Sequence, residues 1–472
     1  MPGSVIVSGA RTPIGKLAGT LAGFSAMELG GAAIAAALER AGLRPDQVDY
    51  VFMGQVLGAG QGQITARQAA VAGGIPMTVP ATTVNKVCLS GLNAIYLADL
   101  LIAAGEAEIV VAGGMESMTR APYLLPGARS GYRLGDATVV DSMMHDGLFC
   151  AFDQCAMGLG TDRYVREIGI SRDRQDAFSA LSHERAAQAI KDGRFSPEIT
   201  PVSVPQRKGD PLVMDTDEGV RPDTTVEALA RLRPAFDPAG TVTAGNASQI
   251  SDGAAAVIVA SKSAVDRLGL GCLAEIAPVT VPQRKGDPLV MDTDEGVRPG
   301  TTVDTLARLR PAFDPAGTIT AGNASQISDG AAAVIVASKS AADRLGLGYL
   351  AEIAGYGQVA GPDASLLTQP SRAALRALER AGLGVADVSL FEINEAFAAV
   401  AIASMDDLGI TSDICNVNGG AIALGHPIGM SGTRLALSIA LELGRRDGGY
   451  GVAAMCGGGG QGDALLLRVS RR

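Results

Sequence analysis

The chain has 472 residues, which is more than one hydrophobic core usually supports, and this length predicts two or three domains. Hydrophobic residues make up 47 % and charged residues 19 %, which excludes a disordered chain and indicates a compact α/β enzyme. The formal net charge of −10 argues against a general nucleic-acid surface, although a local basic patch or a helix N-terminus could still hold an anionic small ligand.

Six cysteines are spread along the chain without the density of a disulfide scaffold or the spacing of a zinc site, which favours free thiols in a reducing compartment. They are Cys88, Cys150, Cys155, Cys272, Cys415 and Cys456. The N-terminus shows no signal-peptide pattern, and no apolar run has the length of a membrane span. We therefore expect a cytoplasmic protein with no nucleic-acid partner, no membrane partner and no metal.

Two stretches of the chain repeat faintly in the same order. The heptapeptide Ala-Leu-Glu-Arg-Ala-Gly-Leu stands at 37–43 and again at 377–383, each time as the end of a predicted helix that leads into a strand. Further on, Ser90-Gly91 and Ser431-Gly432 each open a helix that is followed by a short apolar strand. This recurrence predicts two related α/β halves whose sheets are covered by helices.

Cys88 stands immediately before the helix predicted from Leu92 to Ala104. A thiol at a helix start lies among unpaired backbone N–H groups and the positive end of the helix dipole, and both favour the nucleophilic thiolate. The alternative is a small buried hydrophobic residue, which is the role of most free cysteines and is favoured when this segment is taken alone.

A tandem repeat occupies the middle of the chain. Residues 201–277 recur as 278–354 with seven differences, which indicates a recent duplication rather than a repeat architecture. We expect an N-terminal half at 1–120 plus about 245–270, a loop domain at 121–245 and a C-terminal half at 349–472. Residues 271–348 are expected to be looped out, because loop closure costs little more as a loop lengthens.

The C-terminal half supplies three polar groups framed by glycines. Asn394-Glu395 ends a strand, His426 lies in a glycine-rich turn before a helix, and Cys456 ends a strand ahead of four glycines. The other two histidines, His145 and His183, lack a partner and are expected to be solvated or to cap helices. No single one of these motifs is decisive, but their order in one chain is.

These motifs together resemble the thiolase family over essentially the whole chain, once one repeat copy is set aside. The segments that carry the resemblance are 85–91, 113–118, 394–397, 419–432 and 456–460. The resemblance implies an α/β thiolase fold of two related five-stranded mixed-sheet halves plus an inserted loop domain. It also implies condensation of two acetyl-CoA to acetoacetyl-CoA and CoA, or the reverse thiolysis, by a homodimer or homotetramer.

The resemblance also implies a role for each motif residue. Cys88 takes the acyl group as a thioester, while His426 accepts its proton and helps to bind the thioester oxygen. Asn394 holds a water in that oxyanion hole, and Cys456 moves the α-proton of the second acetyl-CoA. The backbone N–H groups of Cys88 and Gly458 resemble a second oxyanion hole.

Coenzyme A thioesters are the implied substrates, and no permanently bound cofactor is expected. The residues that match the family's coenzyme A contacts are Ser248 and its duplicate Ser325, Arg221 and its duplicate Arg298, Met157, Ala396 and Phe397. Two departures, Ala156 where many acetoacetyl-CoA thiolases have histidine and Gly457 where a larger apolar residue is common, leave the acyl-chain preference open.

Other functions stay as alternatives. One is a broader 3-ketoacyl-CoA thiolase of β-oxidation, and another is an inactive duplicated protein that only binds acyl-CoA. A ketoacyl synthase is disfavoured because Cys456 stands where histidine or asparagine is expected. A nicotinamide enzyme is weaker still, because residues 58–62 lack the strand and helix context of a dinucleotide-binding loop.

Overall fold

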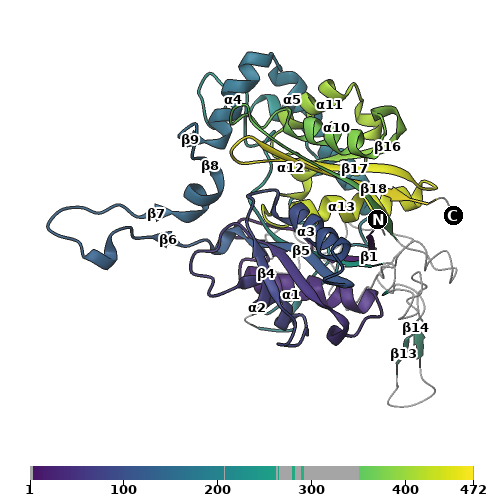
Figure 1. The fold of residues 1–472 in the computed structure, drawn as a ribbon. Coiled ribbons are helices and arrows are strands. Elements are labelled where there is room, and N and C mark those ends of the chain that lie inside the picture. The colour runs from purple at the N-terminus through teal and green to yellow at the C-terminus, as the bar shows by residue number, and fades with distance from the viewer. Residues whose placement is uncertain are drawn as a thin grey trace, which may run out of the picture.

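The computed structural model describes residues 4–206, 208–261, 264, 279–281, 289–291 and 350–470. Two halves lie one above the other in Figure 1, the N-terminal half in purple and blue and the C-terminal half in green and yellow. The N-terminal strands, in sheet order, are β4 (Ala81–Val84), β3 (Tyr50–Gly54), β5 (Ile109–Ser117), β12 (Ser251–Ala260) and β1 (Val5–Arg11). The C-terminal strands are β16 (Val388–Ile393), β17 (Gly449–Gly457), β18 (Gln461–Val469) and β15 (Ala351–Ala360).

The two halves share one topology, as the sequence recurrence predicts. The pair β3–β5 is parallel, and β5–β12 and β12–β1 are antiparallel. In the other half β16–β17 is parallel, and β17–β18 and β18–β15 are antiparallel. A short β1–β15 ladder joins the two sheets at Val5 and Ile6, and the two-residue β2 (Gly15–Lys16) pairs with β12.

The C-terminal half differs from the expected five strands. It has four strands among the described residues, and the fifth place is held by one parallel bridge between Phe391 and Cys415. The neighbouring backbone is short because Asn416 interrupts it with a left-handed φ of 49° and donates its side-chain amide to the carbonyl of Ile393. Local side-chain bonding thus takes the place of most of a fifth strand's ladder.

Helices cover both faces of the sheets. The N-terminal half has α1 (Ala26–Arg40), α2 (Thr65–Ala72) and α3 (Ser90–Ala103), and Ser25 and Glu28 form a capping box at the start of α1. The C-terminal half has α10 (Gln369–Ala381), α11 (Ala398–Leu408), α12 (Ala421–Leu424) and α13 (Ser431–Arg445). The helices α3 and α13 lie between the two sheets (Figure 1).

The contact between α3 and α13 depends on one glycine from each helix. A Cβ on Gly91 would lie 2.8 Å from Thr433 Oγ1, and a Cβ on Gly432 would lie 2.4 Å from the backbone nitrogen of Leu92. The Thr433 hydroxyl also donates to the carbonyl of Gly91 over 3.1 Å. The two first turns therefore touch backbone to backbone, and the loops before them are brought together.

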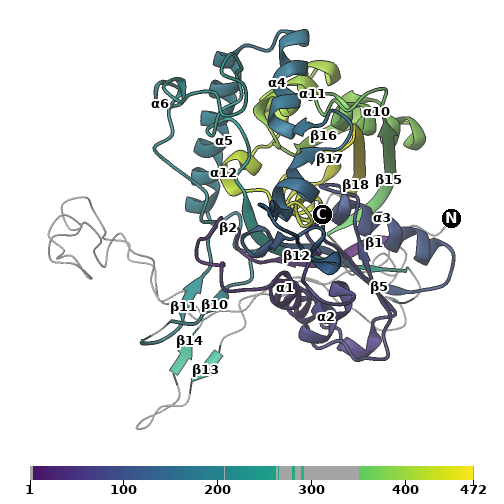
Figure 2. The ribbon, with the colours of Figure 1, turned by 90° about the vertical axis from the view of Figure 1, so that its left-hand side faces the viewer.

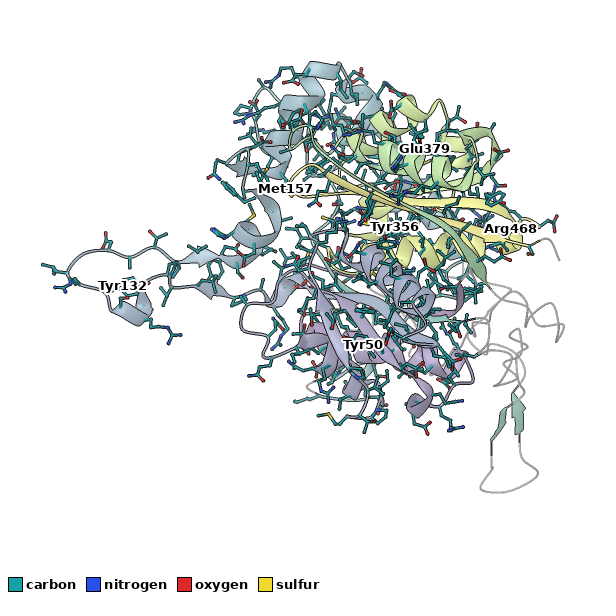
Figure 3. The ribbon with its side chains drawn as sticks, in the orientation of Figure 1. Tyr50, Tyr132, Met157, Tyr356, Glu379 and Arg468 are labelled. Carbon is teal, nitrogen blue, oxygen red and sulfur yellow. The ribbon has the colours of Figure 1, made fainter. Side chains whose placement is uncertain are left out.

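Residues between β5 and β12 form a loop domain on one side. Its elements are β6 (Tyr123–Leu124), β7 (Val140–Asp141), β8 (Phe149–Cys150), β9 (Cys155–Ala156), α4 (Met157–Ile168), α5 (Arg172–Lys191), β10 (Val202–Val204), β11 (Leu212–Met214) and α6 (Val226–Ala230). The strands β6 and β7 begin an arm that extends away from the body, and Tyr132 lies on it (Figures 1 and 3). The helix α5 packs on α11 and α12.

The first repeat copy supplies β12, which is fully buried between β1 and β5. Figure 2 labels the hairpin β10–β11 of this copy and the hairpin β13 (Val279–Val281) with β14 (Leu289–Met291) of the second copy. Both hairpins pair in the same register, 77 residues apart. Most of the second copy, including Arg298 and Ser325, lies outside the described residues.

The helix crossing can be tested with a matched pair of substitutions on α13. We expect Gly432→Ala to lower the free energy of unfolding by about 1–3 kcal/mol, because its methyl group meets backbone that cannot yield. We expect Gly444→Ala to raise it by about 0.5–1 kcal/mol, because nothing lies within 4 Å of its Cβ position. Urea unfolding measures both, and equal effects of the two substitutions would contradict the crossing.

Candidate active site

Cys88 is buried in a tight turn between β4 and α3. Val87 before it has a φ of 51°, a left-handed conformation that a β-branched residue adopts only under constraint. The constraint comes from side chains: Asn85 Oδ1 accepts the N–H of Val87 over 3.0 Å, and Ser90 Oγ donates to the carbonyl of Val87 over 2.6 Å. The turn thus holds the thiol in one place ahead of the helix.

The Cys88 turn is also attached to the C-terminal half. Lys86 Nζ forms an ion pair with both carboxylate oxygens of Asp463 on β18, over 2.7 and 2.9 Å. The hydroxyl of Tyr356 donates to the same carboxylate over 2.5 Å. Since β18 pairs with the strand that carries Cys456, this contact fixes the two cysteine-bearing segments relative to each other.

His426 is held in a single orientation by its neighbours. Its Nδ1 lies 2.6 Å from Ser431 Oγ, and that hydroxyl donates its own proton to the carbonyl of Pro427 over 3.1 Å. The hydrogen-bond network therefore assigns the imidazole proton to Nδ1 and leaves the lone pair on Nε2. The backbone N–H of His426 donates to the carbonyl of Gln249 and to Ser251 Oγ, both over 3.2 Å.

Asn394 follows β16 and faces His426, with its Nδ2 3.3 Å from the histidine Nε2. The side chain is fully buried, and its Oδ1 has no hydrogen-bond partner within the described part of the chain. A buried amide oxygen without a partner costs free energy unless a ligand or water supplies a donor. This atom therefore marks the place where a small polar molecule would bind.

Cys456 is the last but one residue of β17 and is buried beside the Cys88 turn. A Cβ on Gly457 would lie 2.6 Å from Leu89 Cγ, and a Cβ on Gly458 would lie 3.4 Å from Val87 Cγ1. The glycines after Cys456 therefore allow the two cysteine segments to approach closely. Glycine at position 457 has a structural explanation, because Leu89 occupies the space that a larger side chain would need.

The electrostatics correct one expectation from the sequence. Burial, and to a smaller extent the carboxylate of Glu116, raise the pKa of the Cys88 thiol to about 12. Desolvation outweighs the helix start, so the expectation that the helix start favours the thiolate is wrong. Burial also raises the pKa of Cys456, with the negative charge of an ionised Cys88 as the second cause.

His426 is neutral over the physiological range, because burial lowers its pKa to about 3, with the nearby Arg434 as a second cause. A neutral imidazole with its lone pair on Nε2 can accept a proton, as a general base must. The candidate site thus combines two thiols and one neutral base, and charge has to appear as a substrate reacts.

Three of the predicted coenzyme A contacts come together. The N–H of Ser248 donates to the carbonyl of Ala396 over 3.0 Å, and Ala247 forms a backbone bridge with Phe397. Met157 lines a cavity with Gly459, and its methyl carbon lies 3.8 Å from the Cβ position of Gly458. Figure 3 shows Met157 where the loop domain meets the body.

Arg221 and His183 lie together at a different place. Arg221 is exposed, and its backbone N–H donates to Nδ1 of His183 over 3.1 Å. His183 is buried, so the expectation of a solvated histidine is wrong. Burial lowers its pKa to about 4, with the charge of Arg221 as the second cause.

Several residues of the site carry no obvious sequence signal. Ser431 and Ser251 hold the ring and the backbone of His426, yet each looks like an ordinary helix or strand start. Glu395 accepts hydrogen bonds from Ser182 over 2.7 Å and from Asn416 over 2.8 Å, and so ties α5 to the segment after β16. Their partners are distant in the chain, so only the fold reveals these roles.

Comparisons with known proteins agree over nearly the full length. The family model "Thiolase, N-terminal domain" matches residues 4–263 and 271–340, and "Thiolase, C-terminal domain" matches 347–469. The chain is 49 % identical to a "Probable acetyl-CoA acetyltransferase" of Mycobacterium leprae, with 99 % of this chain and all of the relative covered. It is 44 % identical to an "Acetyl-CoA acetyltransferase" of Pseudomonas aeruginosa and to one of Cupriavidus necator, with 98 % of each chain covered.

Two further properties concern the described residues alone. No helix there is long and apolar enough to cross a membrane. No group of three or more histidine, cysteine or acidic side chains is placed there to hold a metal ion.

The ionisation state of Cys88 can be measured by alkylation with iodoacetamide in a Cys456→Ala background. With a pKa of about 12, we expect the rate at Cys88 to rise about tenfold for each pH unit from 7 to 10, because only the thiolate reacts. Peptide mapping identifies the labelled cysteine. A rate that levels off below pH 9 would show that the helix start dominates after all.

Proposed function

The chain belongs to the thiolase family, and we propose that it is an acetyl-CoA C-acetyltransferase that works through an acetyl thioester on Cys88. Two buried pairs support this proposal: the thiol of Cys88 interacts with that of Cys456, and the neutral imidazole of His426 lies 3.3 Å from Asn394, whose Oδ1 has no partner among the described residues. Acyl transfer followed by carbon–carbon bond formation needs a nucleophile, a base for it, an oxyanion site and a second base.

In the first half-reaction, Cys88 Sγ attacks the thioester carbon of acetyl-CoA and its proton passes to Nε2 of His426. The bond from carbon to the coenzyme A sulfur breaks, and the leaving thiolate takes a proton from Cys456. The products are acetyl-Cys88, free coenzyme A, a protonated His426 and a Cys456 thiolate. The two new charges face each other in a buried site, where their attraction is strong.

In the second half-reaction, the Cys456 thiolate removes the α-proton of a second acetyl-CoA. The resulting enolate attacks the carbonyl carbon of acetyl-Cys88, and the Cys88 sulfur leaves and regains its proton from His426. Protonated His426 and a water on Asn394 Oδ1 would stabilise the enolate oxygen, and the N–H groups of Cys88 and Gly458 would stabilise the acyl oxygen. Acetoacetyl-CoA is released, and every group returns to its starting state.

The coenzyme A moiety would enter beside the loop domain. Ser248, Ala396, Phe397 and Met157 lie on the approach to Cys456, and the exposed Arg221 is the cationic group that would meet the anionic end of the nucleotide. We also place the enzyme in the cytoplasm, since the five described cysteines are all unpaired.

A homodimer or homotetramer is the proposed assembly. The arm after β6 exposes large apolar side chains far from any core, among them Tyr123 at 67 %, Leu125 at 53 % and Val139 at 54 % exposure. Such a surface is unfavourable in water unless another copy covers it. The end strand β4 also offers an open edge for pairing.

We further propose that the first repeat copy is the one that completes the fold, while 271–348 is accommodated as an insertion between the halves. This copy contributes β12 and the loop of Asn246, whose side chain is fully buried and donates to Asp176 and to the carbonyl of Thr241, each over 3.0 Å. That these bonds are made by residues of the first copy supports the proposal.

The two cysteines can be separated by their half-reactions. We expect Cys88→Ala to lower both acetyl-CoA condensation and the exchange of labelled coenzyme A into acetyl-CoA by about 10³-fold or more. Cys456→Ala should lose condensation by about 10²- to 10⁴-fold but keep exchange within about tenfold, because protonated His426 can supply the proton to coenzyme A. Loss of exchange in Cys456→Ala would contradict the division of roles. Equal thiolysis rates on long 3-ketoacyl-CoAs would indicate a broader substrate range.

The choice of repeat copy can be tested with the same substitution at equivalent positions. We expect Asn246→Ala to lower the free energy of unfolding by about 1–3 kcal/mol, because buried donors and acceptors lose their partners. Asn323→Ala, 77 residues later, should change it by less than about 0.5 kcal/mol. Thermal unfolding and the KM for acetyl-CoA measure both variants. The reverse order would show that the second copy completes the fold.

A further inference from the structure

Glu116 is a buried carboxylate that the two half-reactions leave without a role. It is fully inaccessible, and it is the last but one residue of β5. Cys456 is the last but one residue of β17, and each of the two pairs with a glycine of the neighbouring strand, Gly253 or Gly462. Glu116 thus occupies in the N-terminal half the position that Cys456 has in the C-terminal half.

The carboxylate of Glu116 is bonded to both halves of the protein. Its Oε2 accepts the N–H of Val56 over 3.0 Å and its Oε1 accepts the N–H of Leu57 over 3.2 Å, both from the segment after β3. The same Oε2 accepts the N–H of Gly429 over 3.1 Å. Gly429 belongs to the turn that carries His426, so this one side chain joins the base of the reaction to the other half.

The His426 turn enters a socket lined by glycines. The carbonyl oxygen of Gly429 would lie 2.8 Å from a Cβ on Gly54, 2.9 Å from one on Gly91 and 2.0 Å from one on Gly114. Three separate elements of the N-terminal half, β3, α3 and β5, therefore each have a glycine where this peptide group packs. Glu116 is the side chain that holds the turn there by a charge-assisted hydrogen bond.

We propose that Glu116 is a positioning residue of the acetyl transfer: its carboxylate locks the His426 turn against the strands that flank Cys88. The inference rests on the proposed function for its effect on turnover. Loss of the carboxylate releases the N–H of Gly429 and allows the imidazole to move away from the thiol, and a displacement of about 1 Å at a reacting group can cost about 10²-fold in rate.

The charge state of Glu116 gives the lock a pH dependence. Burial, and to a smaller extent the carboxylate of Asp252 on β12, raise the pKa of this carboxyl to about 7 against the opposing effect of the three backbone N–H groups. The other titratable group beside it is the Cys88 thiol, which is neutral at that pH. As the pH falls through about 7, Glu116 gains a proton, accepts hydrogen bonds less strongly, and the lock weakens.

The first test is Glu116→Gln in the full chain, with turnover of acetyl-CoA measured from pH 5.5 to 9. At pH 8 we expect kcat to fall by about 10- to 100-fold with KM changed by less than about twofold. The decline of wild-type kcat below pH 7 should disappear from the variant, because the group that titrates is gone. A purely structural residue would lower kcat at all pH values and leave the shape of the profile unchanged.

A second variant keeps the proposal testable if Glu116→Gln does not fold. Asp252→Asn leaves Glu116 and Gly429 in place but removes a neighbouring negative charge, so it should move the acidic decline of kcat to lower pH with kcat at pH 8 within about threefold of wild type. An unshifted decline in Asp252→Asn, or a Glu116→Gln enzyme with wild-type kcat and profile, would overturn the proposal.

Alkylation of Cys88 separates failure of this inference from failure of the proposed function. Without the Glu116 carboxylate the pKa of Cys88 should fall, so Glu116→Gln should shift the alkylation profile to lower pH even if the enzyme has no turnover. If the wild-type protein forms no acetyl-Cys88 but Glu116→Gln still shifts the alkylation profile, the acetyl transfer is refuted and the contact between Glu116 and Cys88 is supported. An unshifted profile would refute the contact itself.

Discussion

The active site depends on the crossing of α3 and α13 at Gly91 and Gly432. In each half a loop leads into the inner helix, α3 or α13. The first turns of these two helices touch with no side chain between them. The loops immediately before the helices carry Cys88 and His426, one from each half. The equivalent segments of two related halves thus meet face to face, and neither half holds a complete site alone.

Buried polar contacts extend this arrangement into the loop domain and the first repeat copy. Arg11 on β1 forms ion pairs with Glu198 and Asp217, both over 2.7 Å, and all three side chains are buried. Ser251 and the backbone of Gln249 hold the N–H of His426, and these residues lie in the same copy as Asp217. Removing one partner of a buried ion pair leaves an uncompensated buried charge, which costs much free energy. The first repeat copy is therefore held by its polar contacts as well as by the pairing of β12.

Much of this arrangement could be predicted from the sequence, and the limits have physical causes. The recurrence of helix and strand patterns predicts two related halves because those patterns are local. The helix start singles out Cys88 as a candidate, and the glycine-framed motifs do the same for His426, Asn394 and Cys456. The pKa of Cys88 could not be predicted, because it depends on how many distant residues exclude water from the thiol. The role of Glu116 was hidden for a related reason: its three partners are backbone groups, which every residue has.

The raised pKa values explain why the reaction needs two cysteines rather than one. In a dry site neither thiol gives up a proton unless a positive charge or a forming bond compensates it. In the proposed mechanism the first acetyl transfer would supply both, since it would leave His426 protonated and turn Cys456 into a thiolate. The carbon acid would then be deprotonated by a base that exists only after acylation has occurred. Such an order would keep the enzyme from holding a reactive thiolate before acylation, and it would couple enolate formation to the presence of the acetyl group that the enolate attacks.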